Sequence, residues 1–101
     1  MSTTPTAKEV TLKFHSDPAH GWLEVSKSMA RLHLREKYLQ ITCFSYMREN
    51  NLYLEEDCDA PLLIQAMREA GFNVKFEELD TDDSPIRQYD GFMSKTTTDE
   101  A

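Results

Sequence analysis

The sequence is poor in the residues that build specialised binding loops and metal sites. Its three glycines stand alone at Gly21, Gly71 and Gly91, which excludes a glycine-rich phosphate loop. The two cysteines, Cys43 and Cys58, form no CxxC motif, and no HExxH motif is present. No apolar run approaches the ~18 residues of a membrane-spanning helix. Phosphate-loop enzymes and helical membrane proteins are therefore excluded, and no standard metal motif remains.

The amino terminus, MSTTPTAKE, has neither the basic region nor the apolar core of a secretion signal. We therefore expect a cytoplasmic protein with no membrane partner, in which both cysteines stay reduced. A chain of 101 residues is long enough for one domain with a modest core. We expect a single globular domain over residues 9–93, with flexible tails at 1–8 and 94–101.

Basic residues are scarce in the second half of the chain. Residues 51–84 carry two Lys or Arg and ten Asp or Glu, whereas residues 1–50 carry seven and five. The acid is concentrated in EEDCD, 55–59, and EELDTDD, 77–83. Direct nucleic-acid binding is disfavoured, because attraction to phosphates requires a basic face. A protein partner with a basic surface fits this charge better, although an ordinary solvated acidic face explains it too.

The hydrophobic patterning predicts an α+β fold with the element order ββαββαβ. Period-two alternation indicates strands, and apolar positions at helical spacing indicate helices. The predicted strands are 9–15, 22–25, 38–47, 52–56 and 72–79. One helix begins at a Ser26 or Ser28 cap and runs through Leu34; the other begins at Asp57 or Asp59 and ends at Gly71. A mostly antiparallel sheet with two helices on one face would bury these apolar stripes.

The connections between the predicted strands carry recognisable turn chemistry. SDPAHG, residues 16–21, and RENN, residues 48–51, are each expected to close a hairpin. After the last strand, the chain is expected to turn at Ser84 and Pro85. It would then dock against the domain through Ile86, Tyr89 and Phe92.

HSDPAHGWLEV, residues 15–25, admits two interpretations. His15, Asp17 and His20 can supply two imidazoles and a carboxylate to a zinc ion, with Cys58 or Cys43 completing a tetrahedral set. Alternatively, His15 ends a strand, Asp17 organises the turn, and His20 is exposed or hydrogen-bonded beside Trp22. The spacing does not decide between a metal site and a turn.

Cys58 lies beside a predicted helix start, where a helix dipole can lower a thiol pKa. Its acidic neighbours Glu56, Asp57 and Asp59 should instead raise that pKa and disfavour a nucleophile. Glu55, Glu56, Asp57 and Asp59 are also a candidate acid/base or magnesium cluster. Neighbouring residues on a strand face opposite sides, however, and cannot form one pocket. No catalytic residue is predicted.

Four stretches resemble those of small proteins of tailed phages and mobile elements. They are FHSDPAHGWLEV (14–25), SYM (45–47), YLEEDCDAP (53–61) and DSPIRQYDGF (83–92). The resemblance covers residues 10–92, and the chain departs from it in SKSMARLHLREKYLQ, residues 26–40. It implies an accessory gene product of a bacterial virus that acts in the host cytoplasm. It carries no activity and no catalytic residue.

Two classes of function follow from these observations. The first is a binding protein that contacts a basic host or phage protein, and that in one form inhibits a host or defence protein. Its predicted contact residues are Trp22, Tyr53, Glu55, Glu56, Asp57, Asp59, Glu77, Glu78 and Tyr89. The second is a small metal-binding module or metal-dependent enzyme that uses His15, Asp17, His20 and Cys58, with zinc as its metal. Otherwise no cofactor is expected, and a homodimer is compatible with a sheet that has edge strands.

Overall fold

The computed structural model describes residues 8–82 and 84–92. Their elements are, in order, β1 (Lys8–Ser16), β2 (Gly21–Ser26), α1 (Lys27–Leu34), the short helix η1 (Arg35–Gln40), β3 (Tyr46–Arg48), β4 (Asn51–Glu55), α2 (Ala60–Glu69), β5 (Phe72–Asp80), the short helix η2 (Pro85–Gln88) and β6 (Asp90–Gly91). The predicted α+β class is confirmed, and the predicted order fits apart from the added β6 and the two short helices.

The strands form one six-stranded sheet in the order β5-β1-β2-β4-β3-β6. Neighbouring strands pair antiparallel, except that β1 and β5 run parallel over nine residue pairs from Lys8 with Phe72 to Ser16 with Asp80. Both predicted hairpins form: β1 joins β2, and β3 joins β4. At the second turn, Glu49 takes a positive φ of 55°.

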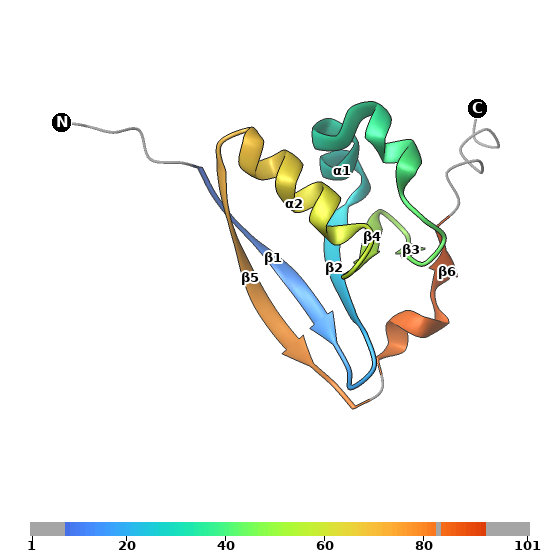
Figure 1. Ribbon diagram of the computed structural model, residues 1–101. Helices are drawn as coiled ribbons and strands as arrows, with labels where there is room; N and C mark the ends of the chain where they lie inside the picture. Colours follow the sequence, from blue (N-terminus) through green and yellow to red (C-terminus); the bar gives the residue numbers. More distant parts are fainter. Residues whose placement is uncertain (1–7, 83, 93–101) are drawn as a thin grey trace.

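Helices α1 and α2 lie on the same side of the sheet (Figure 1), which we call the helix face. Side chains alternate across the strands, so Leu23 and Val25 point to this face while Trp22 and Glu24 point to the other. The main core lies between the helix face and the helices. It contains Leu12, Leu23, Val25, Ala30, Leu34, Tyr38, Ile41, Leu52, Leu54, Ala60, Leu63, Met67, Val74 and Phe92.

The opposite side, which we call the aromatic face, carries a second cluster. Trp22, Tyr53 and Ile86 are buried together, with Tyr46 and Tyr89 packed against them. Ile86 belongs to η2, which lies on the far side of the sheet from α1 and α2 (Figure 1). The predicted docking of the chain after β5 is confirmed, although its residues divide between the two faces: Phe92 packs with Tyr38 in the main core.

Local signals place most of the helix ends correctly. The Ser26 hydroxyl accepts a hydrogen bond from the Met29 amide and caps α1. Pro61 lies in the first turn of α2, and Gly71 follows that helix with φ 96°, a conformation that glycine adopts without a steric cost. The predicted aspartate is found at the start of α2, but the predicted capping bond is not. Asp59 occupies the cap position, but its side chain makes no capping bond because it binds a different loop.

The predicted strand over residues 38–47 is also wrong, because only Tyr46–Arg48 forms a strand there. The preceding residues form η1 and a loop in which Tyr38 and Ile41 are both buried, a spacing that a strand alternating between two faces does not give. The loop is held by Asp59, whose carboxylate accepts from the Thr42 amide, at 3.0 Å, and from the Thr42 and Ser45 hydroxyls. These bonds replace the ladder of a strand.

The predicted tails lie outside the described residues, except Lys8, which begins β1. No helix among residues 8–82 and 84–92 is long and apolar enough to cross a membrane.

Candidate functional site

The turn between β1 and β2 is organised by Asp17. Its Oδ1 accepts hydrogen bonds from the amides of Ala19 and His20, both at 2.9 Å, as in an Asx turn. The Asp17 amide donates to the His20 carbonyl at 2.9 Å, which closes the loop. HSDPAH is therefore a turn in which the carboxylate of Asp17 holds the backbone.

The same carboxylate also fastens the segment that follows β5. Arg87 reaches it with two nitrogens, Nε to Oδ2 at 3.0 Å and Nη2 to Oδ1 at 2.9 Å, and the Ser84 amide donates to Oδ2 at 3.3 Å. The Asp17 side chain is only 2% exposed. The Arg87 guanidinium, assisted by the backbone amides, holds the pKa of Asp17 well below its usual range and keeps it ionised.

The two histidines of the predicted zinc site have separate surroundings. His15 Nε2 lies 2.7 Å from Glu24 Oε1, while the His20 ring lies beside Trp22 with ring centroids 5.9 Å apart. In the described part of the chain, no three His, Cys, Asp or Glu residues are grouped so that they could hold a metal ion. The zinc hypothesis therefore stays a prediction, and the described residues supply no set of ligands for it.

The predicted acidic residues do not form one face. Asp59 is 1% exposed and bound to Thr42 and Ser45 inside the protein, so the expectation that it lies on a contact surface is wrong. Glu77 and Glu78 point to opposite faces of the sheet, because neighbouring residues of a strand alternate between its two sides. Glu78 lies beside Phe14, which packs against the main core on the helix face, and Glu77 lies beside Lys13. Glu55, Glu56 and Asp57 lie close together in the sequence, but Glu56 lines a different cavity from the other two.

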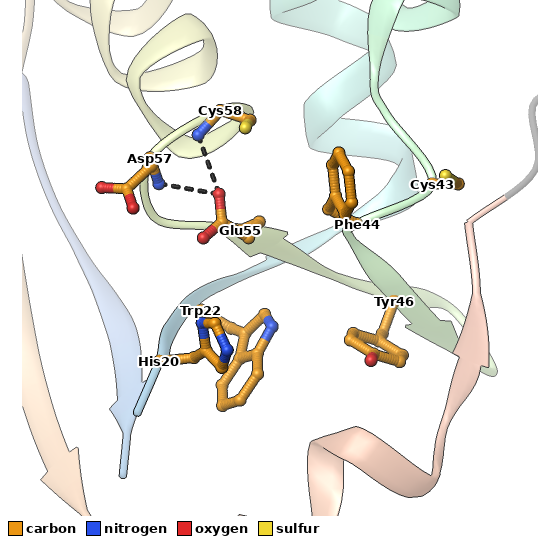
Figure 2. A pocket seen from close by; sticks show the side chains of 8 residues that line it. All are labelled: His20, Trp22, Cys43, Phe44, Tyr46, Glu55, Asp57 and Cys58. Atoms are coloured by element: carbon orange, nitrogen blue, oxygen red, sulfur yellow. Dashed lines mark hydrogen bonds between the residues drawn. The ribbon is translucent and has the colours of Figure 1, made fainter. Parts of the chain in front are cut away.

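Glu55 and Asp57 line a cavity of about 320 Å³, which we call the acidic cavity. Its lining residues are His20, Trp22, Cys43, Phe44, Tyr46, Glu55, Asp57 and Cys58. Figure 2 shows Glu55 and the Phe44 ring above the rings of Trp22 and Tyr46. The two carboxylates are the charged acidic groups of this lining, and none of the Lys or Arg residues that the structure describes belongs to it. An aromatic cavity with a negative rim results.

Glu55 also shapes the turn at the rim of the acidic cavity. Its Oε1 accepts from the backbone amides of Asp57 and Cys58, both at 2.9 Å (Figure 2). The nearby Glu55 carboxylate raises the pKa of the Cys58 thiol, and burial, Asp59 and Asp57 add to this effect. The predicted direction of that shift is confirmed, but Glu55 rather than Glu56 is its main cause. Cys58 is therefore a poor nucleophile at neutral pH.

Glu56 belongs to a second cavity, of about 310 Å³, on the other side of the turn. Glu78 of β5 lines it as well, together with Phe14, Ala60, Ile64 and Phe76. The close approach here requires a glycine at position 21: a Cβ on Gly21 would lie 2.6 Å from the Phe14 ring and 2.7 Å from Glu56 Oε1. The second cavity thus brings together one glutamate from each predicted acidic cluster.

The aromatic residues predicted to be exposed are mostly buried. Trp22 is 2% exposed and Tyr53 is covered by Tyr89, with ring centroids 5.0 Å apart, so the expectation that both are exposed is wrong. Trp22 nevertheless forms part of the wall of the acidic cavity. Burial raises the pKa of the Tyr53 hydroxyl. Tyr89 is half-buried, and the Arg48 guanidinium lies over its ring at 5.0 Å. These rings are covered because η2 packs over them.

The exposed aromatic residue of the acidic cavity is one that sequence reasoning missed. Phe44 is 63% exposed and lies in the loop that precedes β3. Its position inside an apparent alternating strand hid it, because every other residue of such a strand is expected to be buried. Tyr46 was missed for the same reason. Neither is marked by charge or by spacing.

The acidic cavity has the chemistry to hold a cation beside aromatic rings. Comparison of the chain with models of protein families, with curated proteins and with solved structures found no match.

Proposed function

We propose that this chain is a non-enzymatic binding protein that holds an arginine or lysine side chain of a protein partner in the acidic cavity. The observation that carries the proposal is the composition of the cavity wall, which among the described residues has aromatic rings and two carboxylates but no Lys or Arg. A guanidinium or ammonium group fits such a wall, because aromatic faces attract cations and the carboxylates pair with them.

Two features of the cavity support an arginine in particular. The exposed Phe44 ring offers a flat apolar surface against which the stem of a long side chain can pack. A planar guanidinium can also pair with a carboxylate through two parallel hydrogen bonds.

The wider charge pattern supports a basic surface around that side chain. Residues 51–84 carry ten Asp or Glu against two Lys or Arg, and Glu56 and Glu78 line the neighbouring second cavity. Long-range attraction between such a surface and a basic partner speeds their association and weakens with salt. One form of the proposal is a protein that occupies a basic nucleic-acid groove of its target.

The resemblance to small proteins of tailed phages and mobile elements supports an accessory role for this binding. The proposed setting is the cytoplasm of a bacterial host, and the proposed target is a host or defence protein that the chain inhibits or redirects. No cofactor is part of this proposal.

The test compares two charge reversals that change the net charge equally. Asp57→Lys places a cation at the rim of the acidic cavity, whereas Glu69→Lys places one at the end of α2, outside its lining. Short peptides that contain arginine, or citrulline in its place, are titrated into each isotope-labelled protein. We expect the arginine peptide to shift the indole signal of Trp22 in the native protein and in Glu69→Lys, and not in Asp57→Lys.

Affinity capture from host lysate at low and high salt then seeks the partner, with the metal content of the same sample measured. A partner that is retained by Glu69→Lys and lost by Asp57→Lys supports the proposal. Equal losses in both variants would show that only net charge matters, and equal shifts with arginine and citrulline peptides would show that the cavity does not recognise a cation. Either result would overturn the proposal.

A further inference from the structure

The strand β5 lies at one edge of the sheet. It pairs along its whole length with β1, and in the described part of the chain no strand pairs with its other edge (Figure 1). Nine residues, Phe72–Asp80, are available there. An edge strand of this length presents backbone amides and carbonyls on which another strand can pair.

The centre of β5 is complementary to itself when it is reversed, because Lys75 and Glu77 flank Phe76. We propose that two copies of this chain pair antiparallel through β5, with Phe76 of one copy opposite Phe76 of the other. The pair would join the two sheets into one continuous sheet in which the helices of both copies lie on the same side. This proposal is independent of the acidic cavity, which β5 does not line.

Charge complementarity fixes the register. With the two Phe76 residues opposite each other, Lys75 of each copy lies directly opposite Glu77 of the other, and symmetry produces this pair twice. Side chains opposite each other in an antiparallel pair are about 5 Å apart at Cβ, within reach of an ion pair. Moving the axis to residue 75 or 77 would place Lys75 against Lys75 or Glu77 against Glu77, so those registers are repelled.

The neighbouring strand extends the alternation of charge across the junction. On the aromatic-face side, Lys13 of β1 lies beside Glu77 in the parallel pair. The row from one copy to the other would therefore read Lys13, Glu77 and then the second copy's Lys75. Lys75 Nζ already lies 3.4 Å from Glu9 of β1, with more than half of both side chains exposed, so it can bridge two carboxylates.

The helix-face side of the strand contributes apolar contact. Phe76 is 39% exposed, one of the large hydrophobic side chains that the fold leaves open. In the proposed pair, its ring meets the same ring of the second copy and loses its contact with water. Charged residues on an edge strand usually keep it from pairing. Here Lys75 and Glu77 lie opposite each other in the register centred on Phe76, so their charges favour pairing in this register.

The test measures the mass of the full chain by sedimentation from low micromolar to submillimolar concentration. We expect a concentration-dependent dimer. Lys75→Glu and Glu77→Lys should each weaken it about tenfold, because each places like charges opposite each other twice. The double variant Lys75→Glu with Glu77→Lys restores opposite charges across the junction in swapped order and should recover part of the lost affinity. The recovery is expected to be incomplete, because the swap also places like charges beside Glu9 and Lys13 within each copy. Lys37→Glu on η1 is the matched control and should have no effect beyond its net charge.

Circular dichroism of each variant confirms that it is folded, and hydrogen exchange reports the junction itself. Amides of β5 should exchange faster as the native protein is diluted, whereas those of β4 should not. A protein that stays monomeric throughout overturns the proposal, as does a dimer that the single variants leave intact. A double variant that dissociates as readily as the single ones overturns the proposed register.

Discussion

The two faces of the sheet are covered by different means. On the helix face, aliphatic side chains such as Leu23, Leu54 and Leu63 are completely buried beneath two α-helices. On the aromatic face, Trp22 and Tyr53 are covered by η2, a helix of four residues. The residues of both clusters are buried, but η2 has only four residues and buries too little apolar area to hold its own position.

Directed polar contacts hold that short cover in place. Asp17 accepts from the Ser84 amide and pairs with Arg87, and the Phe92 amide donates to the Ser45 carbonyl at 2.8 Å. The helix face therefore depends on hydrophobic area, whereas the aromatic face depends on charge and hydrogen bonding. The two should respond differently to truncation and to pH.

The largest expected effect comes from truncation on the helix face. Leu54→Ala should lower the free energy of unfolding by about 3 kcal/mol, because it removes a completely buried side chain and leaves a cavity. Urea denaturation measures the loss. Its neighbour Tyr53 points to the other face, and Tyr53→Phe, which keeps the ring, is the control with a smaller expected effect. Similar losses of unfolding free energy in Leu54→Ala and Tyr53→Phe would contradict the proposed difference between the two faces.

Truncation on the aromatic face should have a smaller and more local effect. Ile86→Ala should cost about 2 kcal/mol, because Ile86 anchors η2 in the cluster beneath it. Hydrogen exchange should quicken mainly in residues 84–92, while amides of β2 and β4 remain protected. Gln88→Ala alters an exposed residue of the same helix and serves as the control. Uniform exchange across the whole sheet in Ile86→Ala would contradict a local cover.

The ion pair that fastens η2 makes the aromatic face sensitive to acid. Arg87 holds the pKa of Asp17 below its value in the unfolded chain, so the stabilisation is complete above about pH 4 and is lost as the pH falls towards the lowered folded-state pKa. Asp17→Asn should therefore be less stable than the native protein at neutral pH, and the difference should shrink in acid.

Urea midpoints of the native protein and Asp17→Asn, compared across that range of pH, measure this effect. Asp82→Asn, at an exposed position, should show no comparable dependence. A gap between the native protein and Asp17→Asn that is constant at every pH would mean that the ion pair does not fasten η2.

The smallest effect on stability is expected at the rim of the acidic cavity. Glu55→Gln keeps an oxygen that can accept from the Asp57 and Cys58 amides, but it removes the charge that raises the Cys58 pKa. In a Cys43→Ser background, alkylation of Cys58 should become faster at neutral pH, and its pH profile should move to lower pH. Glu69→Gln is the control, and an unchanged profile in Glu55→Gln would refute the role of Glu55.

Local sequence patterns determined the elements that depend on neighbours in the chain. Alternation marked β1, β2, β4 and β5, the Asp17 turn and the Ser26 cap were readable from their residue types, and Gly71 marked the end of α2. Such features follow from sterics and hydrogen bonds within a few residues, so a short window of sequence contains their cause.

The tertiary structure alone decided how distant residues combine. The Asp59 side chain binds Thr42, 17 residues away, instead of capping α2, and the chain forms a loop there instead of the strand expected over 38–47. Asp17 pairs with Arg87, which is 70 residues away. The acidic cavity takes its wall from three separate stretches of chain, and the expected acidic face separated because neighbouring carboxylates point to opposite sides. Local preferences do not specify these contacts, since they arise only when packing brings remote segments together and buried polar groups must find partners.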